Sequence, residues 1–312
     1  MYKNKDCSPS SFSKRFFSDR RNVAVNAIFY TFLWGCAFPL VKICLQSFGV
    51  ASTNILAICL IAGIRFACSG AVTLIGCSIF SPKSLKLSGK QLLAATGYGV
   101  AATSLQYAFT YIGLSRIDGS KGAVFDQLWV FVIVIIGGLF FKDERLTLTK
   151  IIGCILGFAG VLAVSTDGIS LTFSLRGEGL MLMAAACQTF ASIYAKKCTS
   201  TIPAPVLTGF GQLIGGILLI VGALISGGRL ETVSSSAILS LVALTLISAI
   251  AYTLSLLPLK YRPVSEVSSY HLLITVFGVV MSAALLDENI FRINYAISLL
   301  LVSFGILLIN RQ

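Results

Sequence analysis

The sequence predicts an all-α integral membrane protein with ten transmembrane helices, arranged as two inverted five-helix repeats. Of its 312 residues, 56% are hydrophobic and 12% are charged, whereas a soluble domain averages about 25% charged residues. A spanning helix needs about 20 mainly apolar residues, and ten such stretches are visible in the chain. A weak similarity between the two halves is the third observation, and it predicts the repeat.

Charged residues and prolines mark the ends of the predicted helices. Pro82 follows the second, Lys196 and Lys197 end the sixth, and Pro263 separates the eighth from the ninth. The predicted spans are 23–45, 54–79, 91–113, 122–141, 148–165, 178–197, 205–226, 237–257, 265–286 and 293–310. Residues 1–22 form a basic N-terminal leader, and residues 166–177 form the linker between the halves.

The distribution of Lys and Arg predicts the orientation in the membrane. With the leader inside, 17 of the 24 Lys and Arg residues fall on the inner side and six on the outer side, while Arg65 lies within a span. Cytoplasmic loops carry the excess of basic residues. We therefore expect both termini in the cytoplasm of a bacterial cell, with the chain in the plasma (inner) membrane.

The two halves of the chain align in a common order. LWGCAFPLVK at 33–42 aligns with CQTFASIYAK at 187–196, Gln106 falls opposite Tyr252, and Asp126 falls opposite His271. The repeats are residues 23–165 and 178–310, and five spans in each would place the copies in opposite orientations. Inverted repeats are a recurring plan of secondary transporters, which bind substrate near the midplane between the halves.

Three ionisable side chains within the spans are candidate site residues. A carboxylate at a helix centre costs about 2.5–3.5 kcal/mol, so Asp126 should face a wet cavity, where it would bind a substrate cation or carry a proton, or a partner such as Lys121. His271 would pair with Asp126 to couple transport to protons, or be hydrogen-bonded in the interior or near the inner surface. Arg65 would meet a substrate carboxylate, bind backbone carbonyls or snorkel.

Aromatic and amide side chains on the spans would stack on and hydrogen-bond a ligand. These candidates are Trp34, Gln106, Tyr107, Trp129, Gln188 and Tyr252, of which Trp34, Gln106, Gln188 and Tyr252 complete the predicted cavity. Tyr111 and Tyr194 are explained more simply as members of an interfacial aromatic belt.

Several kinds of site are excluded by the pattern. Nine cysteines without a CxxC pair and a single histidine argue against a metal or disulfide framework, and no cofactor is expected. The GxxxG pairs at Gly153/Gly157 and Gly211/Gly215 predict close helix packing. No phosphate-binding loop is present, so a gradient would drive transport. The expected partners are a small-molecule substrate, the lipid bilayer and protons as the coupling ion, without nucleic acid; a homodimer is left open.

The chain resembles the EamA family of the drug/metabolite transporter superfamily. The residues that carry this resemblance are Trp34-Gly35, Lys42, Arg65-Phe66, KDERLT at 142–147 and GFAGV at 157–161. The resemblance implies ten helices in two inverted repeats and export or exchange of small metabolites through a central cavity. The second repeat departs from the family pattern, since Gln188 replaces the Trp and Gln212 the Arg, which leaves the halves chemically unequal.

We therefore interpret the chain as a secondary active transporter that moves a small polar metabolite by alternating access. Export of an amino acid or related compound is favoured. The alternatives are uptake or exchange of a nucleoside-like or vitamin-like compound, and a lipid-handling membrane protein. An enzyme would need a cluster of polar groups at one depth, which one histidine and scattered carboxylates do not supply.

Overall fold

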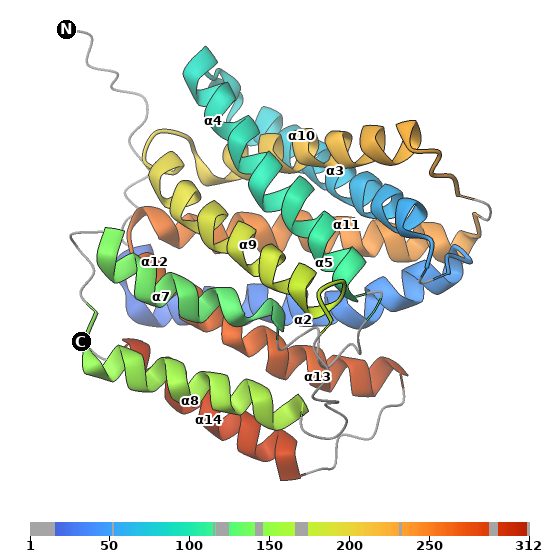
Figure 1. Cartoon of the computed structure of the whole chain (residues 1–312). Helices are drawn as coiled ribbons and strands as arrows, with labels where there is room; N and C mark the ends of the chain where they lie inside the picture. The colour runs from blue at the N-terminus through green and yellow to red at the C-terminus, as the bar shows by residue number, and fades with distance from the viewer. Residues whose placement is uncertain are drawn as a thin grey trace, which may run out of the picture.

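Helices make up the whole regular structure of the residues that the computed structural model describes, which are 16–51, 53–114, 116, 125–140, 146–165, 174–230, 233–286 and 293–310 (Figure 1). The first half contains α2 (Arg20–Ser47), α3 (Ile55–Phe80), α4 (Gly89–Gly99), α5 (Gln106–Leu114), α7 (Leu128–Phe140) and α8 (Leu148–Ser165). The second half contains α9 (Glu178–Cys198), α10 (Ala204–Ile225), α11 (Ser235–Leu256), α12 (Val264–Ser269), α13 (Leu273–Leu286) and α14 (Ile293–Asn310). Every predicted span range thus holds a described helix. The charged turn at 142–145 lies outside the described residues.

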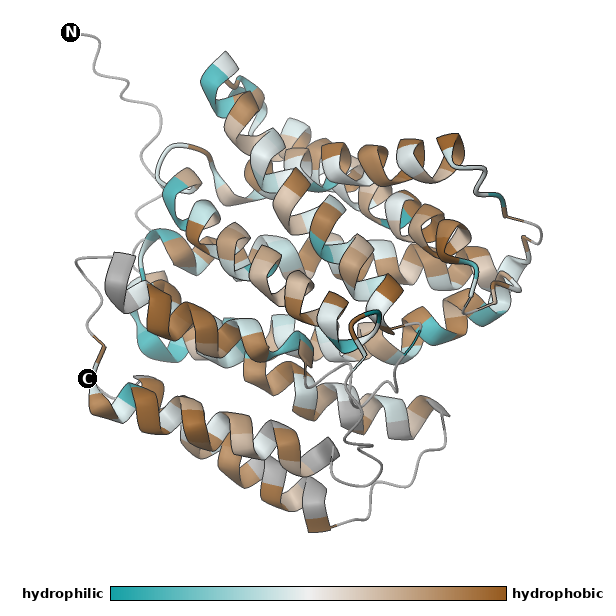
Figure 2. Ribbon diagram, in the orientation of Figure 1, coloured by the Kyte–Doolittle hydropathy of each residue, from teal (hydrophilic) through white to brown (hydrophobic). Residues whose placement is uncertain are grey.

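Hydrophobic residues predominate along most of these helices (Figure 2), and many large apolar side chains are exposed. Leu239 and Leu300 are each 71% exposed, and Phe80 is 86% exposed. Among the described residues, five helical stretches are long and apolar enough to cross a membrane: Arg20–Ser47, Ile55–Phe80, Ala204–Ile225, Ser235–Lys260 and Val264–Ser282. Large apolar faces of this kind require lipid or protein cover, and in helices all backbone groups are satisfied within the segment. The chain is therefore a multi-pass membrane protein.

Short polar side chains cap the starts of several helices. Asn54 accepts a hydrogen bond from the backbone of Ala57 at the start of α3. Ser88 and Gln91 form a capping box at the start of α4. Such caps satisfy backbone N–H groups that have no partner within the helix. The helix limits therefore follow local signals that are readable in the sequence.

Glycines let two pairs of helices approach closely, α3 with α10 and α8 with α14. A Cβ built on Gly70 of α3 would overlap the backbone nitrogen of Leu213 in α10. In the pair of α8 and α14, a Cβ on Gly153 of α8 would lie 2.8 Å from the carbonyl oxygen of Gly305 in α14. The close packing predicted from the two GxxxG pairs is confirmed, because a Cβ on Gly211 would also lie 2.6 Å from the ring of Tyr98.

The helices of the two halves exchange partners reciprocally. α2 packs mainly on α11 and α13 of the second half, and α9 packs mainly on α5 and α7 of the first half. α3 pairs with α10, and α8 pairs with α14 at one edge of the bundle (Figure 1). Most of the contacts that form the core therefore join one half of the chain to the other.

Three of the predicted spans are less regular than expected. The span 91–113 contains a π-helical segment, η2 (Val100–Leu105), between α4 and α5. The span 265–286 is interrupted by the 3₁₀ segment η4 (Tyr270–Leu272) between α12 and α13. In the span 122–141, a turn at Gln127 precedes α7. Such local departures from α geometry are frequent at functional sites. The 3₁₀ segment contains His271, and the other two irregularities adjoin Gln106 and Asp126.

Candidate functional site

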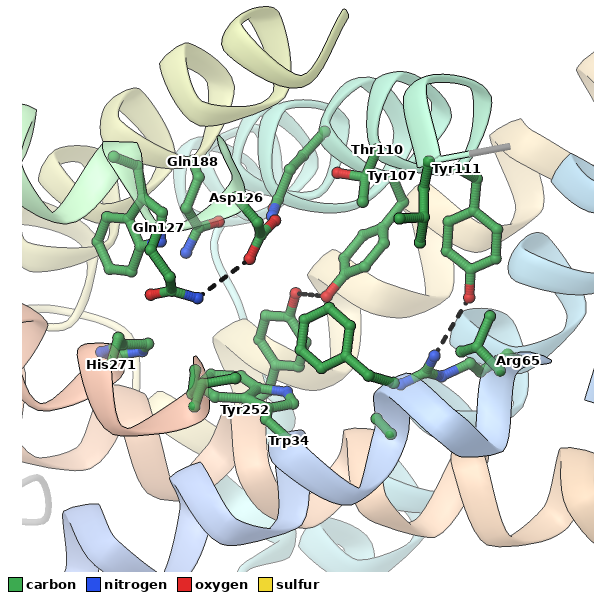
Figure 3. A pocket seen from close by; sticks show the side chains of 17 residues that line it. Trp34, Arg65, Tyr107, Thr110, Tyr111, Asp126, Gln127, Gln188, Tyr252 and His271 are labelled. Atoms are coloured by element: carbon green, nitrogen blue, oxygen red, sulfur yellow. Dashed lines mark hydrogen bonds between the residues drawn. The ribbon is translucent and has the colours of Figure 1, made fainter. Parts of the chain in front are cut away.

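One cavity in the middle of the helix bundle brings all seven predicted site residues together (Figure 3). Its volume is about 100 Å³, measured as the space open to the centre of a water molecule, whereas one water needs roughly 10–15 Å³ by this measure. The cavity therefore has room for a small metabolite. It is lined by Trp34, Ala37, Phe38, Val41, Arg65, Gln106, Tyr107, Thr110, Tyr111, Leu114, Asp126, Gln127, Trp129, Gln188, Tyr252, His271 and Ile274.

Asp126 supplies the carboxylate of this cavity. It lies in helical residues just before α7 and is half-buried. The amide nitrogen of Gln127 donates a hydrogen bond to its Oδ2 at 3.3 Å. In Figure 3 the carboxylate points toward the hydroxyl groups of Tyr107 and Tyr252. Lys121, the partner considered from the sequence, lies outside the described residues.

His271 is held by three aromatic rings from two helices, α2 and α7. Its ring centroid lies 5.3 Å from that of Tyr30, 5.2 Å from that of Trp34 and 4.9 Å from that of Trp129. Only 6% of the residue is exposed, so it lies in the interior rather than at the inner surface. Its Nδ1 has no hydrogen-bond partner among the described residues. Asp126 and His271 therefore line the same cavity from different helices, as the repeat predicted.

Arg65 is held by neutral side chains. Its Nε donates to Ser248 Oγ at 2.8 Å, and its Nη1 donates to Tyr111 Oη at 3.2 Å. Its guanidinium carbon lies 5.0 Å from the centroid of the Phe66 ring, a cation–π geometry. These bonds go to side chains and not to the backbone carbonyls considered from the sequence. Two of the three guanidinium nitrogens therefore hold helices together, which favours a structural role for Arg65.

The interfacial position predicted for Tyr111 is wrong. Tyr111 is only 6% exposed, lines the cavity and accepts the hydrogen bond from Arg65. Tyrosine has an apolar ring and a polar tip, so the residue type suits a membrane surface and a buried hydrogen bond equally. Tyr194, by contrast, is half-buried outside this cavity and stacks on Phe190.

A hydrogen bond between two tyrosines crosses the cavity from one half to the other. The hydroxyl oxygens of Tyr107 in α5 and Tyr252 in α11 lie 2.5 Å apart. Tyr107 also packs on Phe66, with ring centroids 4.2 Å apart, and Trp34 packs edge-on against Tyr252 at 5.0 Å. The aromatic wall of the cavity is thus a continuous set of contacts between α2, α3, α5 and α11.

Several cavity side chains have a polar atom without a hydrogen-bond partner among the described residues. These atoms are Trp34 Nε1, Gln106 Oε1, Thr110 Oγ1, Gln127 Oε1, Gln188 Oε1 and His271 Nδ1. Buried polar groups are nearly always satisfied by protein or water. Six such groups around one cavity are available to water or to a polar ligand. Gln106 directly follows the π-helical segment.

A second, smaller cavity adjoins the first. It measures about 20 Å³ on the same scale and extends toward Tyr98, Leu259 and Val267. The two cavities share five lining residues, which are Trp34, Trp129, Gln188, Tyr252 and His271. These five side chains form the partition between the cavities.

The sequence analysis missed two polar lining residues, Thr110 and Gln127. Thr110 follows Gln106 by four positions, so helical periodicity places both on one face, and this signal was available. Gln127 directly follows Asp126, where the local turn and not a regular helix brings both side chains into the cavity. Within the described residues, no group of three or more His, Cys, Asp and Glu side chains could hold a metal.

Comparison with known proteins gives a consistent result. Residues 22–166 and 175–311 match the EamA-like transporter family. The chain is 28% identical over 304 residues to "Uncharacterized transporter YvbV" of Bacillus subtilis, with 94% of this chain and 93% of the relative covered. It is 26% identical over 301 residues to "Probable amino-acid metabolite efflux pump" of Escherichia coli, with 91% and 93% covered.

A solved crystal structure has the same fold. The TM-score is 0.74 at 17% sequence identity, and the match covers 91% of this chain and 96% of the other. The resemblance seen in the sequence motifs is confirmed by the match of the family over both halves. The chain belongs to the EamA-like transporter family.

Proposed function

We propose that this EamA-like protein is a secondary active transporter that moves a small polar metabolite across a bacterial plasma membrane. The observation that carries the proposal is the central cavity, which combines one carboxylate, one histidine and three glutamine amides from both halves of the chain. A polar cavity inside an otherwise apolar bundle marks a substrate or ion path. One relative is named as an efflux pump for amino-acid metabolites, which favours export of an amino acid or related compound.

The proposed topology has ten spans in two inverted repeats, residues 23–165 and 178–310, with both termini in the cytoplasm. The reciprocal exchange of partners between α2 and α9 supports this arrangement, because a two-fold relation between the halves would produce it. The family matches each half separately, over 22–166 and 175–311, which supports it further. In this plan the substrate site lies at the interface between the repeats.

The proposed mechanism is alternating access about the five partition residues. In the proposed orientation the larger cavity, which reaches Leu114, opens toward the outside, and the smaller one, which reaches Leu259, lies toward the cytoplasm. Rocking of one repeat against the other would enlarge one cavity while it closes the second. Asp126, with His271 nearby, would carry the coupling proton.

Flux measurements in proteoliposomes test this proposal. The purified protein is reconstituted without ATP, a proton gradient is imposed, and an extract of bacterial metabolites on one side is followed by mass spectrometry. We expect at least one polar compound to move under the gradient, and no movement in protein-free vesicles. A strict requirement for ATP would contradict the gradient mechanism.

A further inference from the structure

The cavity contains two opposite charges of unequal availability. Arg65 is 3% exposed, and two of its three guanidinium nitrogens are engaged by Ser248 and Tyr111. Asp126 is half-buried, and the donor to it among the described side chains is the neutral amide of Gln127, at 3.3 Å. The carboxylate is therefore the more accessible of the two charged groups, while most of the guanidinium is packed into the cavity wall.

The surroundings of Asp126 match the chemistry of a protonated amine. The rings of Trp34, Tyr107 and Tyr252 line the same cavity, and aromatic faces attract organic cations where water is excluded. The side-chain oxygens of Gln106, Gln127 and Gln188 lack donors among the described residues. An ammonium group carries three N–H donors and no acceptor, so it suits a carboxylate and amide oxygens. An anion would instead need N–H donors, and Arg65 already donates to Ser248 and Tyr111 through two of its nitrogens.

We propose that the transported substrate carries a protonated amine that binds Asp126 against the aromatic wall, and that a substrate carboxylate is not required. This inference rests on the proposed transport function and names the chemical class of its substrate. It distinguishes an organic amine from an amino-acid zwitterion whose carboxylate would be bound by Arg65.

Intrinsic fluorescence offers a direct measurement of binding. The chain has two tryptophans, Trp34 and Trp129, and both line the cavity, so their emission reports on its occupancy. The probes are four compounds of similar size and different charge: phenethylamine, phenylalanine, phenethyl alcohol and 3-phenylpropionate. We expect phenethylamine to bind the purified protein at least as tightly as phenylalanine, and the alcohol and the anion to bind much more weakly.

Two carboxylate variants test the assignment to Asp126. A hydrogen bond to a charged group is stronger than one between neutral groups, so Asp126→Asn should weaken phenethylamine binding by about tenfold or more. Asp19→Asn is the matched control, since it removes the same charge from an exposed N-cap where Asn caps equally well, and its affinity should equal that of the wild type. If Asp126→Asn does not fold, the ranking of the four probes on the wild type decides alone.

The outcomes separate the substrate class from the transport function. Preferred binding of the anion, binding of phenylalanine but not phenethylamine, or unchanged amine affinity in Asp126→Asn would overturn the inference. The same probes are then offered to proteoliposomes under a proton gradient. If amines bind but neither they nor any metabolite moves, the assignment of an amine-binding site at Asp126 stands and the transport proposal fails. If other metabolites move while amines neither bind nor move, the transport proposal stands and the inference fails.

Discussion

Arg65 illustrates how a buried charge is stabilised at the scale of single residues. Two hydroxyl groups and one aromatic ring surround it, and Ser248 in turn donates its own hydrogen to the carbonyl oxygen of Leu244 at 2.9 Å. The hydroxyl of Ser248 thus accepts one hydrogen bond and donates another. Arg65 thereby joins α3 to α5 and α11, and we assign it to the stability of the cavity wall.

The first prediction concerns these two hydroxyl groups. Ser248→Ala and Tyr111→Phe should each reduce stability, because each leaves one N–H group of Arg65 without an acceptor. Interhelical hydrogen bonds in membranes contribute about 0.6 kcal/mol on average and up to about 1.7 kcal/mol. Thermal unfolding in detergent, followed by fluorescence, measures the loss. Ser78→Ala is the control, because the exposed hydroxyl of Ser78 bonds within α3, and it should melt at the wild-type temperature. The assignment of Arg65 to the cavity wall fails if Ser248→Ala and Tyr111→Phe also melt at that temperature.

The second prediction concerns the pair of Tyr107 and Tyr252. Removal of one hydroxyl leaves the other buried without its partner, which costs about 1–3 kcal/mol, whereas replacement of both is nearly neutral. We therefore expect Tyr107→Phe and Tyr252→Phe each to destabilise the protein, and the double variant to be less destabilised than the two single effects combined. The same unfolding measurement decides, and strictly additive losses would mean that the two hydroxyls are not coupled.

The sequence was sufficient to predict seven of the residues that line the cavity, but not their partners. Asp126, Arg65 and His271 could be predicted because ionisable groups inside apolar spans are costly and need a polar environment. The bonding partner of Arg65 could not, since Ser248 is 183 positions away and nothing local indicates that contact. Tyr111 was misassigned because its amphipathic side chain suits both an interface and a buried hydrogen bond.

The pairing of α3 with α10 is the clearest feature at the scale of helices. Gly70 and Gly216 bring the two backbones into contact, and a Cβ on either glycine would overlap the backbone of the other helix. A Cβ built on Gly76, which lies farther along α3, would meet nothing within 4 Å. The same helix therefore offers one glycine that is required for packing and one that is not.

The third prediction compares these two glycines. Gly70→Ala should destabilise the protein by about 1–3 kcal/mol, because the added methyl group overpacks the interface. Gly76→Ala should be neutral or stabilising by up to about 1 kcal/mol, because alanine has the higher helix propensity. Melting temperatures of the two variants in the same detergent measure the difference. Equal melting temperatures would contradict the close packing of α3 on α10.

The limits of the helices were more predictable than their irregular segments. The second span was predicted at 54–79 and observed as Ile55–Phe80, because capping residues and Pro82 mark its ends. The π-helical segment at Val100–Leu105 and the 3₁₀ segment at Tyr270–Leu272 were not predicted. Apolar periodicity does not distinguish these geometries from an α-helix, and tertiary contacts such as that of Ser104 with the carbonyl oxygen of Gly215 select them.

At the scale of the whole molecule, the reciprocal contacts between the halves connect the fold to the proposed mechanism. Helices α2 and α9 each pack against the other half, so the cavity lies where the halves meet and any relative movement changes its shape. Trp34 and Gln188, which the two helices contribute to the partition, are chemically different. The two sides of the partition therefore need not bind the substrate equally.

The fourth prediction concerns topology. Reporter fusions at the N-terminus and at the C-terminus should both read cytoplasmic, because the excess of Lys and Arg lies on that side. A fluorescent protein that folds only in the cytoplasm and a phosphatase that is active only in the periplasm give complementary readings. A periplasmic C-terminus would leave an odd number of spans and would be incompatible with two five-helix repeats.

The measurement that tests the central claim most directly is untargeted mass spectrometry of the growth medium. Cells that over-produce the wild type, Asp126→Asn or the control Asp19→Asn are compared at equal amounts of protein in the membrane. The account predicts at least one polar, amine-bearing compound whose extracellular amount changes with the wild type and with Asp19→Asn but not with Asp126→Asn. Identical changes with the wild type and Asp126→Asn would contradict a transport path through this cavity.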